Sequence, residues 1–163
     1  MVMVFLGPGD YLFARIDEPV SIVLGSCVAL MAWQPELRLT LATHIMLPGR
    51  DPEDEQDLRY ACAVLKRWTA DSIDKGLSMH AFRLGLFGGS SQFFHCQQRE
   101  LSVGYKNITC MHNELRRIGL TLNAEDTGGG IHRKLLFNGQ NGQYQIQYLD
   151  READGKSGVE SCL

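Results

Sequence analysis

The feature that most limits the fold is a pair of nearly continuous apolar runs, Val28–Trp33 and Leu39–Leu47. Between them lie Gln34-Pro35-Glu36, residues that favour a turn, so the two runs are expected to form a hairpin. Strands with so few polar positions are typical of a sheet that is covered on both faces. The chain therefore needs a layer of structure on each side of this hairpin.

Local sequence patterns also predict further strands and two helices. The predicted strands are Tyr11–Ile16, Val20–Leu24, Ala81–Phe87, Leu120–Glu125, and a second hairpin made of Arg133–Asn138 and Gln143–Leu149. The predicted helices are Glu55–Lys75 and a segment from Val103 or Asn107 to Arg117. Helical spacing places Cys62 on the core stripe of the first helix. Because strands outnumber helices, we expect an α+β fold: a layered α/β sandwich of mixed, mostly antiparallel sheets with two main flanking helices.

Size and composition limit the function classes. At 163 residues we expect one domain over residues 1–150 and a disordered tail over residues 151–163. The net charge of -3 argues against nucleic acid as the main partner. No run of about 18 apolar residues exists, so no membrane insertion is expected. The five cysteines are irregularly spaced and no signal peptide is expected, which favours free thiols in the cytoplasm.

Cys27 is the main candidate for chemistry. It ends the turn Gly25-Ser26-Cys27 between two strand-like runs, and His44 lies in a third run. A thiol on a tight turn beside a histidine can be an activated nucleophile, although a free cysteine can also simply pack. Ser21 can orient the histidine, or bond only to the backbone as strand serines do. Gly25 gives the turn the freedom to aim N–H groups near Ser26 and Cys27 at an oxyanion.

Two other patterns contain residue types that bind metals or phosphates. His95-Cys96 and Cys110-x-His112 contain zinc-ligand residue types but no Cys-x-x-Cys pair, so no metal is expected. The glycine blocks Gly88-Gly89 and Gly128–Gly130 lack the lysine of a phosphate loop and the spacing of a dinucleotide site. They are interpreted as turn glycines, and no organic cofactor is expected.

Taken in order, several segments resemble the chemoreceptor glutamine deamidase family, CheD. The matching segments are Ser21–Val28, Thr43–Pro48, Arg59-Tyr60, Leu86–Gly89, Val103-Gly104 with Asn107, Asp126-x-Gly128-Gly129, Arg133-Lys134 and Phe137. The resemblance extends from about Gly9 to Leu149, nearly the whole chain. It implies a catalytic domain over residues 1–150 that converts glutamine side chains of methyl-accepting chemotaxis receptors to glutamates.

The resemblance also implies roles for individual residues. Cys27 would be the nucleophile of a thioester mechanism and His44 its base, with no metal or cofactor. The family usually has threonine where this chain has Ser21; serine keeps the hydroxyl but loses the β-branch that restricts its rotamer. The implied partners are the receptors and a CheC-type phosphatase.

Some departures from the family pattern concern partners rather than chemistry. The family often has lysine at the position of Gly85 and glycine at that of His132, and the stretch Ser90–Leu101 is unlike the common pattern. These changes affect the surface that, in the family, meets the receptor or the phosphatase. Two alternatives stay open: a binding module that regulates a CheC-type phosphatase, and a cysteine hydrolase that acts on another amide or on methyl esters.

Overall fold

Two five-stranded sheets dominate the computed structural model, which describes residues 2–51, 53–93, 95, 97–149 and 158–163. The strands are β1 Val4–Leu6, β2 Tyr11–Arg15, β3 Val20–Leu24, β4 Val28–Gln34, β5 Leu39–Thr43, β6 Arg83–Gly88, β7 Ala124–Thr127, β8 His132–Phe137, β9 Gln143–Leu149 and β10 Gly158–Cys162. The helices are α1 Ala61–Asp74 and α2 Val103–Arg117, with short 3-10 helices η1 Met79–Ala81 and η2 Arg99–Leu101.

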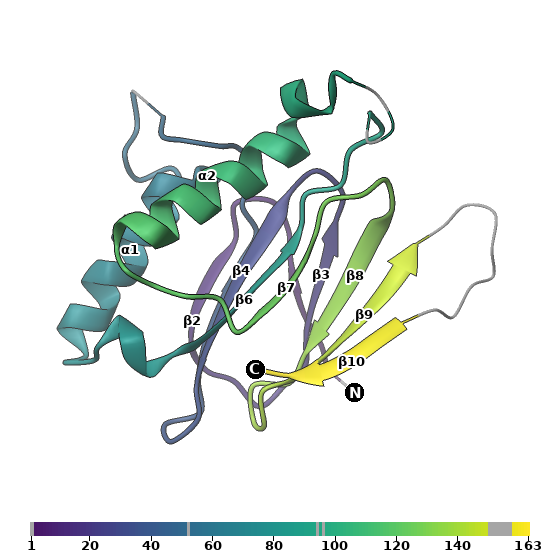
Figure 1. Ribbon diagram of the computed structural model, residues 1–163. Helices are drawn as coiled ribbons and strands as arrows, with labels where there is room; N and C mark the ends of the chain where they lie inside the picture. The colour runs from purple at the N-terminus through teal and green to yellow at the C-terminus, as the bar shows by residue number, and fades with distance from the viewer. Residues whose placement is uncertain (1, 52, 94, 96, 150–157) are drawn as a thin grey trace.

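Both sheets are mixed and mostly antiparallel. The first, called sheet A, has the strand order β1-β3-β8-β9-β10, and the second, sheet B, has the order β2-β5-β4-β6-β7. Only the pairs β1–β3 and β6–β7 are parallel among the strands described. Figure 1 shows the two helices lying together across one side of the strands. The expected α+β sandwich is confirmed.

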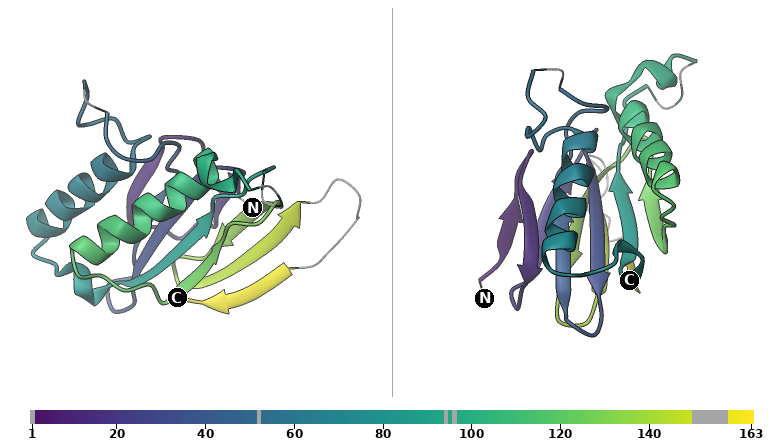
Figure 2. Two further views of the ribbon diagram at one scale, coloured as in Figure 1. Left: turned by 45° about the horizontal axis from the view of Figure 1, so that its top comes forward. Right: turned by 90° about the vertical axis from the view of Figure 1, so that its left-hand side faces the viewer.

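Three layers account for the burial of the central hairpin. The helices cover the outer face of sheet B, where Trp68 and Leu65 of α1 join Leu30 and Leu41 in one core cluster (Figure 2). Sheet A covers the other face, where its Ile22 packs in a second cluster. Every residue of β4 and β5 is buried. The prediction that both faces of this hairpin are covered is therefore confirmed.

Helix α1 begins at Ala61, six residues later than predicted. The acidic residues before it form local turns instead of a first helical turn: Asp54 Oδ1 accepts from Gln56 N, and Asp57 Oδ1 accepts from Arg59 N. Aspartate side chains compete with the helical hydrogen bonds in this way. The Ala61 N–H then bonds to the carbonyl of Leu47, so the helix is anchored to the end of the preceding segment.

Cys62 is half-buried, so its assignment to the core was wrong. The buried positions of α1 include Ala61, Val64, Leu65 and Trp68, and Cys62 is turned away from them toward Glu114 and Arg50. Burial is the main cause that raises the pKa of its thiol, and the neighbouring Glu114 carboxylate adds to it.

Residues 158–163 differ from the expected disordered tail, while residues 150–157 lie outside the described residues. β10 pairs with β9, and Leu163 is only 2% exposed. Its side chain occupies the space beside Gly85: a Cβ built on Gly85 would lie 3.0 Å from Leu163 Cδ2 and 2.6 Å from Phe87 Cε2. Gly85 is buried. This departure from the family pattern therefore makes room for Leu163 rather than altering an exposed surface.

Replacing Leu163 with alanine is expected to lower the free energy of unfolding by about 2–4 kcal/mol, because it empties part of a packed interior. Urea unfolding followed by circular dichroism measures the loss. Val159→Ala, at an exposed position of the same strand, is the matched control and should change stability by less than about 0.5 kcal/mol. Equal effects of the two variants would show that Leu163 does not contribute to the core.

Candidate active site

The turn that carries Cys27, between β3 and β4, is held by its carbonyl groups. All three carbonyl oxygens accept hydrogen bonds from outside the turn. The donors are Ser90 N to Gly25 O (2.9 Å), Asn107 Nδ2 to Ser26 O (2.9 Å) and Gly89 N to Cys27 O (2.8 Å). Since two of the three bonds come from the segment after β6 and one from α2, sheet B and a helix together position the turn.

The glycine that ends β6 and a glycine of α2 permit this close approach. Gly88 has a φ of +101°, and a Cβ built on it would lie 2.4 Å from the carbonyl oxygen of Cys27. A Cβ on Gly104 would lie 2.3 Å from the carbonyl oxygen of Ser90. No other residue type fits either position without moving the backbone. These glycines thus build the support of the Cys27 turn.

The N–H groups of the same turn are left available. Within the described part of the chain, no hydrogen-bond acceptor is paired with the backbone N–H of Ser26 or of Cys27, whereas the N–H of Val28 bonds to Ile45 O at 2.9 Å. Free N–H groups beside a nucleophile can stabilise an oxyanion. The support predicted from Gly25 and Ser26 fits this arrangement and stays a prediction.

Strand register brings Cys27 and His44 to the same face of sheet B. Val28 and Ile45 are directly opposite in an antiparallel bridge, so Cys27 and His44, each one residue before its bridge partner, are diagonal neighbours. Cys27 packs against the core cluster between the sheets, and His44 is 4% exposed. The two side chains therefore lie at the edge of the inter-sheet layer.

The ring of His44 is oriented by a backbone carbonyl from sheet A. Its Nδ1 lies 3.0 Å from the carbonyl oxygen of Leu6, in β1. A carbonyl oxygen only accepts, so Nδ1 carries the proton and Nε2 offers a lone pair. No hydrogen bond joins His44 to Cys27 Sγ among the residues the structure describes. Nucleophile–base contacts are often looser in the absence of substrate.

Ser21 is placed away from His44. The even-numbered residues of β3, Val20, Ile22 and Leu24, face the inter-sheet core, so alternation directs Ser21 to the other face of sheet A. Its cross-strand partners include Phe5, which is exposed. The Ser21 hydroxyl is buried and makes no hydrogen bond to a described residue. A role for Ser21 in orienting the histidine stays a prediction, and Leu6 O is the contact observed.

Two groups that contact the candidate site were given no role in the sequence-based predictions. Asn107 is fully buried in α2, and its Nδ2 donates both to Ser26 O and to Met46 O, at 3.1 Å for the latter. It thereby ties the Cys27 turn to the segment that follows His44. An asparagine on the inward side of a helix was a signal that could have found it. The carbonyl group of Leu6 could not be identified from the sequence, because every residue has a backbone carbonyl group.

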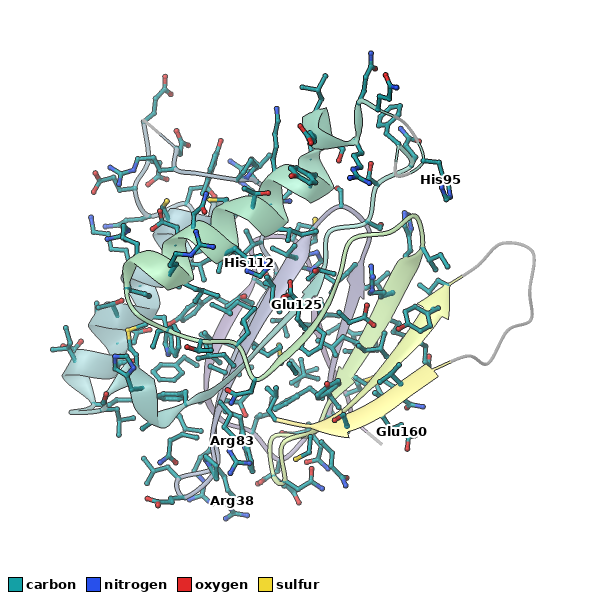
Figure 3. The ribbon with its side chains drawn as sticks, in the orientation of Figure 1. Arg38, Arg83, His95, His112, Glu125 and Glu160 are labelled. Carbon is teal, nitrogen blue, oxygen red and sulfur yellow. The ribbon has the colours of Figure 1, made fainter. Side chains whose placement is uncertain are left out.

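The residues weighed as metal ligands lie apart. The Sγ of Cys110 accepts from Gly49 N at 3.1 Å, and His112 pairs with Glu125 at 2.7 Å. Figure 3 shows His112 and Glu125 pointing toward one another between α2 and β7, with His95 at the upper right of the molecule. Cys96 lies outside the described residues. Across those residues, no group of three or more His, Cys, Asp or Glu side chains is arranged to hold a metal ion.

Burial raises the pKa of the Cys27 thiol above its ordinary value of 9.0. The thiolate fraction at neutral pH is then small and grows as the pH rises through the raised pKa. We expect the rate of Cys27 alkylation by iodoacetamide to increase with pH, with an inflection above the ordinary pKa of 9.0. Peptide mass spectrometry from about pH 6 to about pH 10 measures it. Exposed Cys162 is the control in the same sample; a Cys27 inflection near neutrality would contradict the expectation.

No helix among the described residues has the length and apolarity needed to cross a membrane.

Comparison with known proteins places these residues in context. The family model described as CheD chemotactic sensory transduction matches residues 46–148. A Chromobacterium violaceum protein named probable chemoreceptor glutamine deamidase CheD 1 is 32% identical over 148 residues, which cover 88% of this chain and 76% of that protein. A Geobacter sulfurreducens protein, probable chemoreceptor glutamine deamidase CheD 2, is 32% identical over 152 residues, 93% of each chain.

A Thermotoga maritima protein named chemoreceptor glutamine deamidase CheD is 27% identical over 145 residues, 87% of this chain and 89% of that protein. The family model begins after His44. The alignment with the Geobacter protein covers 93% of this chain. The part left out is too short to exclude positions 27 and 44.

Proposed function

This chain belongs to the CheD family, and on that premise we propose that it is a deamidase that hydrolyses glutamine side chains of chemoreceptors. The relatives that it matches are named chemoreceptor glutamine deamidases. The finer proposal is the chemical class, a cysteine hydrolase that acts through a thioester. The observation that carries it is the shared face of Cys27 and His44, with the His44 ring oriented by Leu6 O at 3.0 Å.

In the first half of the proposed reaction, His44 Nε2 takes the proton of the Cys27 thiol as Sγ attacks the carbon of the glutamine carboxamide. The negative charge moves to the amide oxygen, which the free N–H groups of Ser26 and Cys27 can stabilise. Collapse of this intermediate breaks the C–N bond. His44 gives its proton to the leaving nitrogen, so ammonia departs and a thioester to Cys27 remains.

In the second half, His44 takes a proton from a water molecule, and the resulting hydroxide attacks the thioester carbon. The C–S bond breaks, the proton on His44 returns to Sγ, and glutamate is released. Glutamine and water have become glutamate and ammonia, with the protein unchanged. The raised pKa of the Cys27 thiol makes proton transfer to His44 a necessary part of the attack.

We also propose a cytoplasmic location and a CheC-type phosphatase as a further partner. Four cysteines of the described chain, Cys27, Cys62, Cys110 and Cys162, are free thiols, which supports a reducing compartment. The phosphatase rests on the family resemblance alone. Regulation of such a phosphatase without catalysis is the competing function, and receptor deamidation that Cys27→Ala abolishes separates the two.

The proposal is tested by incubating the protein with cytoplasmic fragments of chemoreceptors, followed by peptide mass mapping and an ammonia assay. Wild-type protein should convert particular glutamines to glutamates, and Cys27→Ala should convert none. Free glutamine and receptor methyl esters in parallel reactions define the substrate class. Undiminished deamidation by Cys27→Ala would exclude the cysteine mechanism, and wild-type protein that acts on no receptor glutamine would exclude the function.

A further inference from the structure

A recess of about 570 Å³ lies beside the segments that support the Cys27 turn. We call it the glycine pocket, and the lining residues that matter here are Ser91, Gly128, Gly129, Ile131, Arg133 and Tyr148. Its wall is continuous with the support of the turn: Ser90 N donates to Gly25 O, and the next residue, Ser91, donates through its N–H to Gly129 O at 2.8 Å. The pocket therefore lies one residue beyond the hydrogen bonds that fix the nucleophile.

The first residue of β8 connects the pocket with the turn on its other side. A Cβ built on Gly25 would lie 3.3 Å from Nε2 of His132, so the tip of that imidazole sits against the turn. Ile131 and Arg133, which flank His132, both line the pocket. Figure 3 shows His95, another lining residue, at the upper right of the molecule. When a substrate residue is bound at Cys27, the side chain of a neighbouring substrate residue can therefore enter the pocket.

The wall of this pocket contains a buried arginine, Arg133, that has N–H groups available to a ligand. The Arg133 side chain is 7% exposed. Its Nε and Nη2 donate to Asp126 Oδ1 at 3.1 and 2.9 Å, and Nη1 donates to Ile131 O. An arginine has five N–H groups, so two of them lack a hydrogen-bond partner among the described residues. Unused donors on a buried cation favour an acceptor oxygen from outside the protein.

The carboxylate of Asp126, in the pocket wall, is already engaged. One oxygen of Asp126 accepts twice from Arg133, and the other accepts from the hydroxyl of Tyr148. The ion pair also balances the charge of the only carboxylate that lines the described part of the pocket. Asp126 therefore adds no unbalanced negative charge that would repel an anionic ligand.

The loop of Gly128–Gly130, which we call the glycine loop, adds backbone N–H donors. Gly128 and Gly129 have φ values of +79° and +72°, and the described residues include no acceptor for the N–H groups of Gly129 and Gly130. A Cβ built on Gly129 would meet nothing within 4 Å, so the space in front of it is open. Successive N–H groups in such a turn form an anion-binding concavity. Arg99 lines an adjoining recess that shares Gly128 and Gly129.

We infer that the glycine pocket binds a carboxylate side chain of the protein substrate, one that lies close to the glutamine held at Cys27. The inference rests on the proposed function and adds a rule for choosing among glutamines: those with an acidic neighbour are preferred. Arg133 and the loop N–H groups supply hydrogen bonds to the carboxylate, which are stronger than those to a neutral acceptor.

The substrate side of the test uses synthetic peptides with a single glutamine. One glutamate is moved in turn through the neighbouring positions on each side, with glutamine-free and glutamate-to-norvaline peptides as references. Binding to the Cys27→Ala protein is measured by calorimetry, and kcat/KM by ammonia release from wild type. At least one position of the glutamate should raise both affinity and kcat/KM about tenfold over its neutral counterpart.

The protein side of the test uses Ile131, which is exposed enough to change without loss of the fold. Ile131→Asp places a carboxylate at the pocket and should remove the preference for the acidic peptide, whereas Ile131→Asn should keep most of it. Val159→Asp, on an exposed site of β10, controls for net charge. Equal kcat/KM for acidic and neutral peptides at every position would overturn the inference while leaving deamidation intact; no turnover of any peptide or receptor fragment would instead count against the proposed function.

Discussion

Replacing His44 with glutamine is expected to lower kcat for receptor deamidation by about 10²–10⁴, the usual contribution of a positioned general base. Glutamine is polar and close to histidine in size, but it has no basic nitrogen and cannot take the thiol proton. The need for a base is acute here because burial raises the pKa of the Cys27 thiol. Ammonia release at saturating receptor fragment measures kcat, and unchanged thermal melting shows that the variant is folded.

Ser21→Ala is the matched comparison, since it tests which group orients His44. The ring bonds to Leu6 O at 3.0 Å, while Ser21 Oγ makes no hydrogen bond to a described residue. We therefore expect Ser21→Ala to keep kcat within about threefold of wild type, because no side-chain contact to the base is lost. A loss as large as that of His44→Gln would assign the orienting role to the hydroxyl, as the family resemblance implies.

The β-rich part of the fold could be predicted because its signals are local. The hairpin of β4 and β5 is marked by apolar runs on each side of Pro35, and that of β8 and β9 by glycines at each end of its turn. The start of α1 could not, since side-chain hydrogen bonds of Asp54 and Asp57 displace helical ones. β10 and the burial of Leu163 depend on a partner strand and a space at Gly85, which no local pattern reports.

The candidate site also has features that the sequence predicts and features that it does not. Cys27 and His44 could be singled out by residue type, and strand register then places them on one face. The face of Ser21 was hidden because its neighbour Val23 is apolar yet 53% exposed, so Val20–Leu24 showed no alternation. The role of Leu6 belongs to a backbone atom of a strand, β1, that was not predicted at all.

Asn107→Leu is expected to have the second largest effect, because one side chain holds two segments of the site. Asn107 Nδ2 donates to Ser26 O at 2.9 Å and to Met46 O at 3.1 Å, and the residue is fully buried. Leucine has a similar shape but no donor, so two carbonyl groups lose their buried partner. At about 1–3 kcal/mol for each of the two unsatisfied groups, the free energy of unfolding should fall by about 2–6 kcal/mol.

The effect on activity should exceed what instability explains. With the turn and the segment after His44 no longer tied together, Cys27 and its base lose their mutual position, and small misplacements cost up to about 100-fold in rate. We expect kcat to fall about 10- to 100-fold at a temperature where circular dichroism shows Asn107→Leu fully folded. Ser72→Ala is the control: its buried hydroxyl has no partner among the described residues, so its removal should leave kcat unchanged and should not lower stability. Normal turnover by folded Asn107→Leu would mean that the hydrogen bonds from Gly89 and Ser90 are enough to position Cys27.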